Sequence, residues 1–176
     1  MTYMGQILAL DLARVTGFAV GRPGEIPRSG SVIFAKEGAS MAAVLSACRA
    51  WLRQFLLDNP AIQLVVFEAP LLPMFKRGKT TIVTIRQLMG LCGTVEEFLY
   101  SKGGYDIREA RVADVRIHFL GSNKHKREEA KRLTVAMCRA RGWIAVDDNA
   151  ADALALWDYQ ATLLARRVDV YADADR

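Results

Sequence analysis

The sequence predicts an α/β fold: a mixed five-stranded sheet, with its first three strands antiparallel and helices on both faces. Three observations predict it: closely spaced apolar runs near the N-terminus, a strand–helix–strand succession after them, and helical periodicity in most of the remainder. The chain has 176 residues, 52% hydrophobic and 24% charged, which suits one compact domain. We therefore expect a single domain over 1–176, with a core over about 5–166.

The first three strands are predicted at 7–11, 17–21 and 30–35. Each is short and mostly apolar, and the connector 22–27 contains two prolines and a glycine, which favour turns. Strands this close together in sequence are typical of an antiparallel meander.

A helix follows from Ser40 to about Leu57, where Ser40 is a suitable N-cap and Pro60 lies just beyond the end. Residues 62–67 read IQLVVF, which is apolar enough for a central strand. A strand, a helix and a strand in this order predict a parallel crossover connection.

The second long helix is predicted from Thr80 or Thr81 to about Lys102. It contains Gly90 and Gly93, each costing roughly 1 kcal/mol relative to alanine. Close approach of another helix, from this chain or from a second subunit, would explain them. The remaining predicted elements are a strand at 105–108, a short helix at 111–119, a basic helix at 124–141, a last helix capped by Asp148 or Asn149 to about Arg166, and a frayed polar tail at 167–176.

Cysteine content and hydropathy exclude several classes of protein. Cys48, Cys92 and Cys138 are an odd number without short pair spacing, which argues against a zinc site or a disulfide framework and favours core positions. No apolar run is long enough for a membrane span, and the N-terminus lacks the pattern of a signal peptide. We expect a cytoplasmic protein that does not associate with membranes.

The charge distribution favours a polyanionic partner. The net charge is +5 and the pI is about 9.3. Basic residues gather in two groups, Lys76, Arg77 and Lys79 after Glu68, and Lys124, Lys126, Arg127, Lys131 and Arg132 before the last acidic group. Basic flanks around an acidic centre suit a phosphate backbone held at an active site.

Acidic residues stand at the edges of three apolar segments. Asp11 ends the first strand, Glu68 ends the central strand, and Asp152 lies among alanines in the last helix, with Asp148 four residues before it. Buried carboxylates need compensation, and a divalent cation supplies it. Two ions about 3.5–4 Å apart can catalyse phosphodiester hydrolysis. The pattern predicts Mg²⁺, with Mn²⁺ as a substitute, although single acids here also suit turns or helix caps.

Four segments together resemble the RuvC family of Holliday-junction resolvases, within the ribonuclease H-like superfamily. The first is LALD at 8–11 followed by RVTGFAV at 14–20. The others are LVVFE at 64–68, RQLMG at 86–90, and DNAADALA at 148–155. Their order and spacing cover residues 7 to about 160.

The resemblance implies metal ligands at Asp11, Glu68, Asp152 and one residue shortly before Asp152. The bacterial pattern has an aspartate three residues before the last one, where this chain has Asn149. Asp148 is the expected substitute, with Asn149 or Asp147 as alternatives. Leu12 and Ala13 replace the usual Pro-Gly after the first aspartate, which suggests a divergent, phage-type member.

The resemblance also implies how DNA is bound. Phe75 is the candidate to stack on a junction base, worth roughly 1–3 kcal/mol, unless its ring folds back onto the core. The expected DNA-binding residues are Phe75, Lys76, Arg77, Lys79, Arg116, Lys124 and Lys126, although the last three also suit a solvated surface. The implied enzyme is a homodimer that uses two Mg²⁺ per site and no small-molecule cofactor. It nicks four-way junctions symmetrically, leaves 5′-phosphates, and would dimerise through the helix at 80–102.

Three other readings of the sequence stay open. One is a broader branched-DNA or RNA nuclease of the same superfamily, and another is a junction-binding protein with weakened catalysis, which Asn149 favours. The third is a fragment of an actin-like or sugar-kinase ATPase, because Asp11 followed by Thr16 and Gly17 loosely fits a phosphate loop. His118 and His125 are candidates for proton transfer, with surface roles as the alternative.

Overall fold

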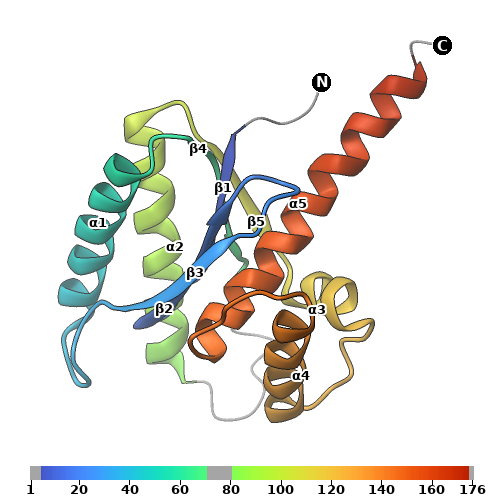
Figure 1. Cartoon of the computed structure of the whole chain (residues 1–176). Coiled ribbons are helices and arrows are strands. Elements are labelled where there is room, and N and C mark those ends of the chain that lie inside the picture. Colours follow the sequence, from blue (N-terminus) through green and yellow to red (C-terminus); the bar gives the residue numbers. More distant parts are fainter. Residues whose placement is uncertain (1–4, 71–80, 175–176) are drawn as a thin grey trace.

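The computed structural model describes residues 5–70 and 81–174. A five-stranded sheet lies between two layers of helices, with α1 and α2 on one face and α3, α4 and α5 on the other (Figure 1). The strands are β1 (Gln6–Asp11), β2 (Val15–Gly21), β3 (Arg28–Ile33), β4 (Ile62–Glu68) and β5 (Asp106–Ala110). The helices are α1 (Met41–Asp58), α2 (Ile82–Lys102), α3 (Val112–Leu120), α4 (Arg127–Ala140) and α5 (Asp148–Ala174).

The strand order is β3-β2-β1-β4-β5, which confirms the predicted mixed sheet. β1, β2 and β3 pair antiparallel, while β4 runs parallel to both β1 and β5. β1 and β4 are the most buried strands because helices cover both of their faces. Their apolar composition is what such a position requires.

Alternation along β1 and β4 divides the core into two parts. Leu8 and Leu10 of β1 pack with α1 and α2, whereas Ile7 and Ala9 pack with α3, α4 and α5. Side chains two residues apart share a face of a strand, so Asp11 continues the row of Ile7 and Ala9. Glu68 continues the row of Leu64 and Val66 in the same way. Both carboxylates therefore belong to the face that α5 covers.

Several element boundaries differ from the predicted ones. α4 begins at Arg127 instead of residue 124. The expected frayed tail is helical, since α5 continues to Ala174 and projects beyond the sheet (Figure 1). No glycine or proline follows Gly142, so nothing in the local sequence stops the helix. The predicted caps of α1 and α2 are confirmed, with Ser40 and Thr81 accepting hydrogen bonds from backbone amides.

The predicted close approach of a helix at Gly90 is confirmed within the chain, because a Cβ there would lie 3.3 Å from the side chain of Leu45 on α1. Gly93 has open space instead. The three cysteines are buried and free, each within a helix, as predicted. Among the described residues, no helix is long and apolar enough to cross a membrane.

Candidate metal centre

Asp11 and Glu68 end neighbouring parallel strands at the same edge of the sheet. Leu10 of β1 pairs with Phe67 of β4, so the two acidic residues follow side by side. Both lie on the α5 face, as the alternation requires. Two carboxylates are thus brought together by strand register alone.

The start of α5 lies over this edge because residue 17 is a glycine. Gly17 pairs with Asp11 in the β1–β2 ladder. A Cβ on Gly17 would lie only 1.9 Å from the backbone oxygen of Asn149 and 2.3 Å from its carbonyl carbon. No larger residue leaves room for the helix at this separation. The contact brings the first turn of α5 against the strand next to Asp11.

The N-terminus of α5 is held by Asp147. Its carboxylate accepts a hydrogen bond from the Ala150 amide at 2.8 Å, and its backbone oxygen accepts one from the Ala151 amide. The Ser31 hydroxyl of β3 donates to the same carboxylate oxygen at 2.7 Å. The prediction of Asp148 or Asn149 as the cap was therefore wrong. Ser31, 116 residues away, fixes the choice of Asp147.

Burial and mutual repulsion raise the pKa of three carboxyl groups. Burial, followed by the charge of Asp152, raises the pKa of Asp11 to about 7. Burial, followed by the charge of Asp11, raises the pKa of Glu68 to about 8. Burial raises the pKa of Asp152 to about 6, against the opposing charge of Lys131. Carboxyl groups perturbed in this way are candidates for a functional site.

Asp148 differs from the other three described carboxylates because a lysine donates a hydrogen bond to it directly. The Lys131 ammonium of α4 donates to its carboxylate and holds the pKa of Asp148 below its ordinary value. The Asp148 charge in turn raises the pKa of both Asp11 and Asp152. The fourth acidic residue is thus part of the same electrostatic cluster.

Two arginines also act on the acidic group. Arg116 of α3 lowers the pKa of Glu68 and of Asp152. Arg127 of α4 lowers the pKa of Asp11 and of Asp152. Arg116, Glu68 and Asp152 line a small cavity of about 40 Å³ between the end of β4 and helices α3, α4 and α5. One side of the acidic centre is therefore lined by cationic groups.

The donor set suits a hard divalent cation. Asp11, Glu68, Asp148 and Asp152 offer only carboxylate oxygens, which Mg²⁺ prefers. In the described ranges, no three Asp, Glu, His or Cys side chains are already arranged to hold a metal ion together. The Lys131 ammonium occupies one oxygen of Asp148. The residues suit such an ion because they offer oxygen ligands and because their carboxylate charges repel one another. A complete ligand shell requires these side chains to move closer together.

The sequence matches no protein-family model and no curated protein. Solved structures do match. Thermus thermophilus RuvC aligns with a TM-score of 0.62 at 15% identity, over 93% of this chain and 96% of that one. The same protein in complex with a Holliday junction substrate aligns at 0.65 and 15%, over 89% and 93%. The yeast mitochondrial Holliday junction resolvase Ydc2 aligns at 0.63 and 10%, over 94% and 81%.

The chain has the fold of RuvC. The predicted ribonuclease H-like fold is confirmed by this likeness and by the sheet topology. At identities of 10–15% the likeness establishes the fold, and the chemistry must be argued from the residues.

The predicted DNA-binding residues divide into three groups. Arg116 lies at the acidic centre. Lys124 and Lys126 are exposed in the segment between α3 and α4. Phe75, Lys76, Arg77 and Lys79 lie outside the described residues.

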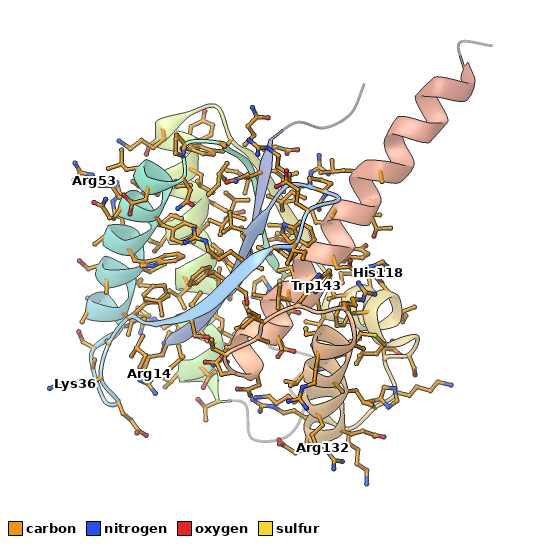
Figure 2. The ribbon with its side chains drawn as sticks, in the orientation of Figure 1. Arg14, Lys36, Arg53, His118, Arg132 and Trp143 are labelled. Carbon is orange, nitrogen blue, oxygen red and sulfur yellow. The ribbon has the colours of Figure 1, made fainter. Side chains whose placement is uncertain are left out.

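Two further arginines lie near the acidic centre's end of the molecule. In Figure 2, Arg14 and Arg132 lie in the lower part of the view, where β1 ends and α5 begins.

Lys131 and Arg127 were absent from the predicted site residues. They are spaced i, i+4 on α4, which places both on one helical face, and both act on the acidic centre. That spacing within the basic helix was a usable signal. It did not separate them from the neighbouring exposed lysines without knowledge of which face α4 turns to the sheet.

Thr16, which suggested a phosphate loop, has a structural role here. The buried Thr16 hydroxyl donates to the Ala13 oxygen at 2.7 Å and accepts from the Ala13 amide at 3.0 Å, which closes the β1–β2 turn. This accounts for the threonine that suggested a phosphate loop. The His118 ring lies 2.8 Å from a carboxylate oxygen of Asp158, and His125 lies near Glu129.

Proposed function

We propose that this protein is a metal-dependent endonuclease that resolves four-way DNA junctions. The observation that carries the proposal is that four carboxylates from β1, β4 and α5 form one electrostatically interacting group on a fold shared with RuvC. One of those structures is a complex with a Holliday junction substrate, which supports branched DNA as the partner. The net charge of +5 suits a polyanion.

Asp11, Glu68 and Asp152 would hold the metal ions, with Asp148 as the fourth ligand. Asp147 is a poor alternative because its carboxylate already accepts from Ser31 and from the Ala150 amide. The backbone of Asn149 contacts Gly17, and this contact holds the first turn of α5 against the sheet. Two Mg²⁺ ions, or Mn²⁺ in their place, would activate the attacking water and stabilise charge on the leaving oxygen.

The cationic residues have a separate part in the proposed reaction. Arg116 and Arg127 would position the phosphodiester, since both already act on the carboxylates that face it. Lys131 would leave Asp148 when the metals bind and compensate the charge of the bound phosphate. Hydrolysis by water, in line, would leave 5′-phosphate and 3′-hydroxyl ends.

We also propose that α2 forms a homodimer interface. Its exposed apolar residues include Ile82, Val83 and Met89, with exposed fractions of 68%, 74% and 48%. Exposed large apolar side chains gathered on one helix mark a contact surface. Gly93 has open space at its Cβ position, which leaves room for a close helix partner. A dimer would place two centres for paired nicks.

The deciding experiment is cleavage of a labelled synthetic four-way junction beside a linear duplex and a flap. Each substrate is incubated with Mg²⁺, with Mn²⁺ and with EDTA. We expect paired symmetric nicks on the junction alone, lost with EDTA. Sedimentation of the protein alone and with the junction tests the dimer.

The other outcomes separate the rival functions. Metal-dependent cutting of the flap or the duplex as well identifies a broader nuclease. Tight junction binding without cutting under either metal identifies a binding protein with lost catalysis, and the nuclease proposal is then wrong.

A further inference from the structure

Three residues form one row across the sheet beneath the start of α5. Asp11 of β1 pairs with Gly17 of β2, and Gly17 pairs with Ser31 of β3. Paired residues share a face of the sheet, so all three face α5. The row begins with a candidate metal ligand, and two residues without any metal-binding role follow it.

The first turn of α5 rests on the last two residues of this row in different ways. Gly17 accepts the backbone of Asn149 at a distance that excludes a Cβ, since the backbone oxygen would be 1.9 Å away. Ser31 donates its hydroxyl to Asp147, whose carboxylate caps the Ala150 amide. One contact limits how close the helix lies to the sheet, and the other fixes where the helix begins.

Asp148 and Asp152 are carried by the turns that these contacts hold. Their charges already raise the pKa of Asp11 from across the gap between helix and sheet. The separation between the strand carboxylates and the helix carboxylates therefore depends on how α5 sits on Gly17 and Ser31. A metal site needs its ligands within a few tenths of an ångström of ideal distances.

We infer that Gly17 and Ser31 are positioning residues of the carboxylate centre. They act by fixing the position of α5 on the sheet. Neither is a proposed metal ligand, and at the start of α5 they contact Asp147 and Asn149. The inference rests on the proposed function for its metal site, and it does not require that DNA is cut. Groups that hydrogen-bond directly to metal ligands typically change metal affinity 10- to 100-fold when they are removed, and Gly17 and Ser31 act one step further from the ligands.

The test compares two substitutions with two matched controls. Ser31→Ala removes the hydrogen bond to Asp147, whereas Ser29→Ala removes a similar bond, 2.6 Å long, from the same strand to the Ile144 oxygen. Gly17→Ala adds a methyl group against helix backbone, whereas Gly30→Ala adds one against the Phe18 ring, a side chain, at 2.8 Å. Both controls lie on β3, and the methyl group added at Gly30 meets Phe18 of β2, so they perturb these two strands without touching the start of α5.

Two quantities are measured on the full chain: Mg²⁺ affinity by titration calorimetry, and amide hydrogen exchange at Ala150 without metal. We expect Ser31→Ala to weaken Mg²⁺ binding roughly tenfold and Gly17→Ala by more. We expect Ser29→Ala and Gly30→Ala to bind Mg²⁺ as the natural sequence does. Of the two serine variants, only Ser31→Ala should show faster hydrogen exchange at the Ala150 amide.

Three results overturn the inference. Unchanged Mg²⁺ affinity in Ser31→Ala, with faster exchange at Ala150, would show a structural role only. An equal loss of affinity in Ser29→Ala would show a general effect of β3. Absence of Mg²⁺ binding in the natural sequence would remove both the inference and the proposed function. If Gly17→Ala does not fold, the serine pair still decides. Normal metal binding with no junction cleavage would refute the proposed function alone.

Discussion

The middle of α1 and the first turns of α5 pack on the two faces of the sheet with side chains of different size, although the α5 face also contains Phe119, Leu154 and Trp157. On the α1 and α2 face, the rings of Phe18, Trp51 and Phe55 form a cluster with centroids 4.7–5.7 Å apart. On the opposite face, the first turns of α5 contribute mostly buried alanines, namely Ala150, Ala151, Ala153 and Ala155. Large rings hold α1 away from the sheet, whereas small side chains let α5 lie close to it.

The difference indicates a division of roles. Large buried side chains supply most of the apolar area that stabilises a fold. Small side chains supply little area, but they fix the separation of two backbones tightly because no flexible atoms lie between them. The acidic residues are on the small-residue face, where Asp152 must lie near Asp11 and Glu68. Metal binding should therefore depend on the α5 face, whereas substitutions confined to the α1 and α2 face should change stability alone.

The largest expected effect is a difference in junction cleavage between a substitution on the α5 face and one on the opposite face. Glu68→Gln should lower junction cleavage by more than about 100-fold, because losing a ligand should cost more than losing a supporting residue. Leu52→Ala on the opposite face should cost about 2–5 kcal/mol of stability. Its cleavage rate at a temperature where it stays folded should be unchanged. Cleavage rates and urea unfolding of the two variants check both statements.

An equal loss of cleavage in Leu52→Ala would contradict this division of roles. Leu52→Met serves as the control, since a volume-conserving exchange usually costs less than about 1.5 kcal/mol.

The second prediction enlarges a small residue on the α5 face. Ala153 is fully buried, so Ala153→Leu should push α5 from the sheet and cost about 1–3 kcal/mol. Mg²⁺ affinity should fall together with stability, because the displaced helix carries Asp148 and Asp152. Calorimetric Mg²⁺ titration beside thermal unfolding measures both. Weakened stability with intact affinity would show that the centre tolerates movement of α5.

The third prediction concerns pH. The pKa values of Asp11 and Glu68 are raised to about 7 and about 8 in the folded protein. Between about pH 4, the ordinary carboxyl range, and pH 8, the folded state holds protons that the unfolded state has released. The free energy of unfolding without metal should therefore fall as pH rises through this window.

Two comparisons sharpen the pH prediction. Glu68→Gln should be more stable than the natural sequence at pH 8 by on the order of 2 kcal/mol, and nearly equal to it at pH 4. Mg²⁺ should stabilise the natural sequence most at pH 8, because it binds the ionised carboxylates. Thermal unfolding at pH 5, 6, 7 and 8 with and without Mg²⁺ tests this. A stability that rises over this range without metal would refute the assignment.

Sequence alone was enough for the sheet and for the acidic residues at its edge. Apolar alternation and strand spacing predict β1 to β4, and the same alternation places Asp11 and Glu68 on one face. These features are local or follow from strand register. The choice between Asp147, Asp148 and Asn149 as the helix cap could not be predicted in this way. All three residue types cap helices, and the choice depends on a serine from a distant strand.

Lys131 was missed for a related physical reason. Five basic residues lie between 124 and 132, and the sequence does not say which of them turns toward the sheet. The packing of Ala130, Thr134 and Cys138, on the side of α4 that contacts α5, decides this because it fixes the rotation of α4. Long side chains such as that of lysine then reach the acidic centre from the adjacent surface.

The smallest expected effect concerns this lysine. Lys131 donates to Asp148 and lowers the pKa of Asp11, Asp148 and Asp152. Lys131→Met should therefore raise these pKa values and shift the midpoint of Mg²⁺ binding to higher pH by about one unit. Mg²⁺ titrations from pH 5.5 to 9 measure the midpoint. Arg132→Met, at the adjacent exposed position on α4, is the matched control and should leave the midpoint in place. An equal shift in both variants would mean that the net charge of α4, and not the ion pair with Asp148, sets the charge state of the centre.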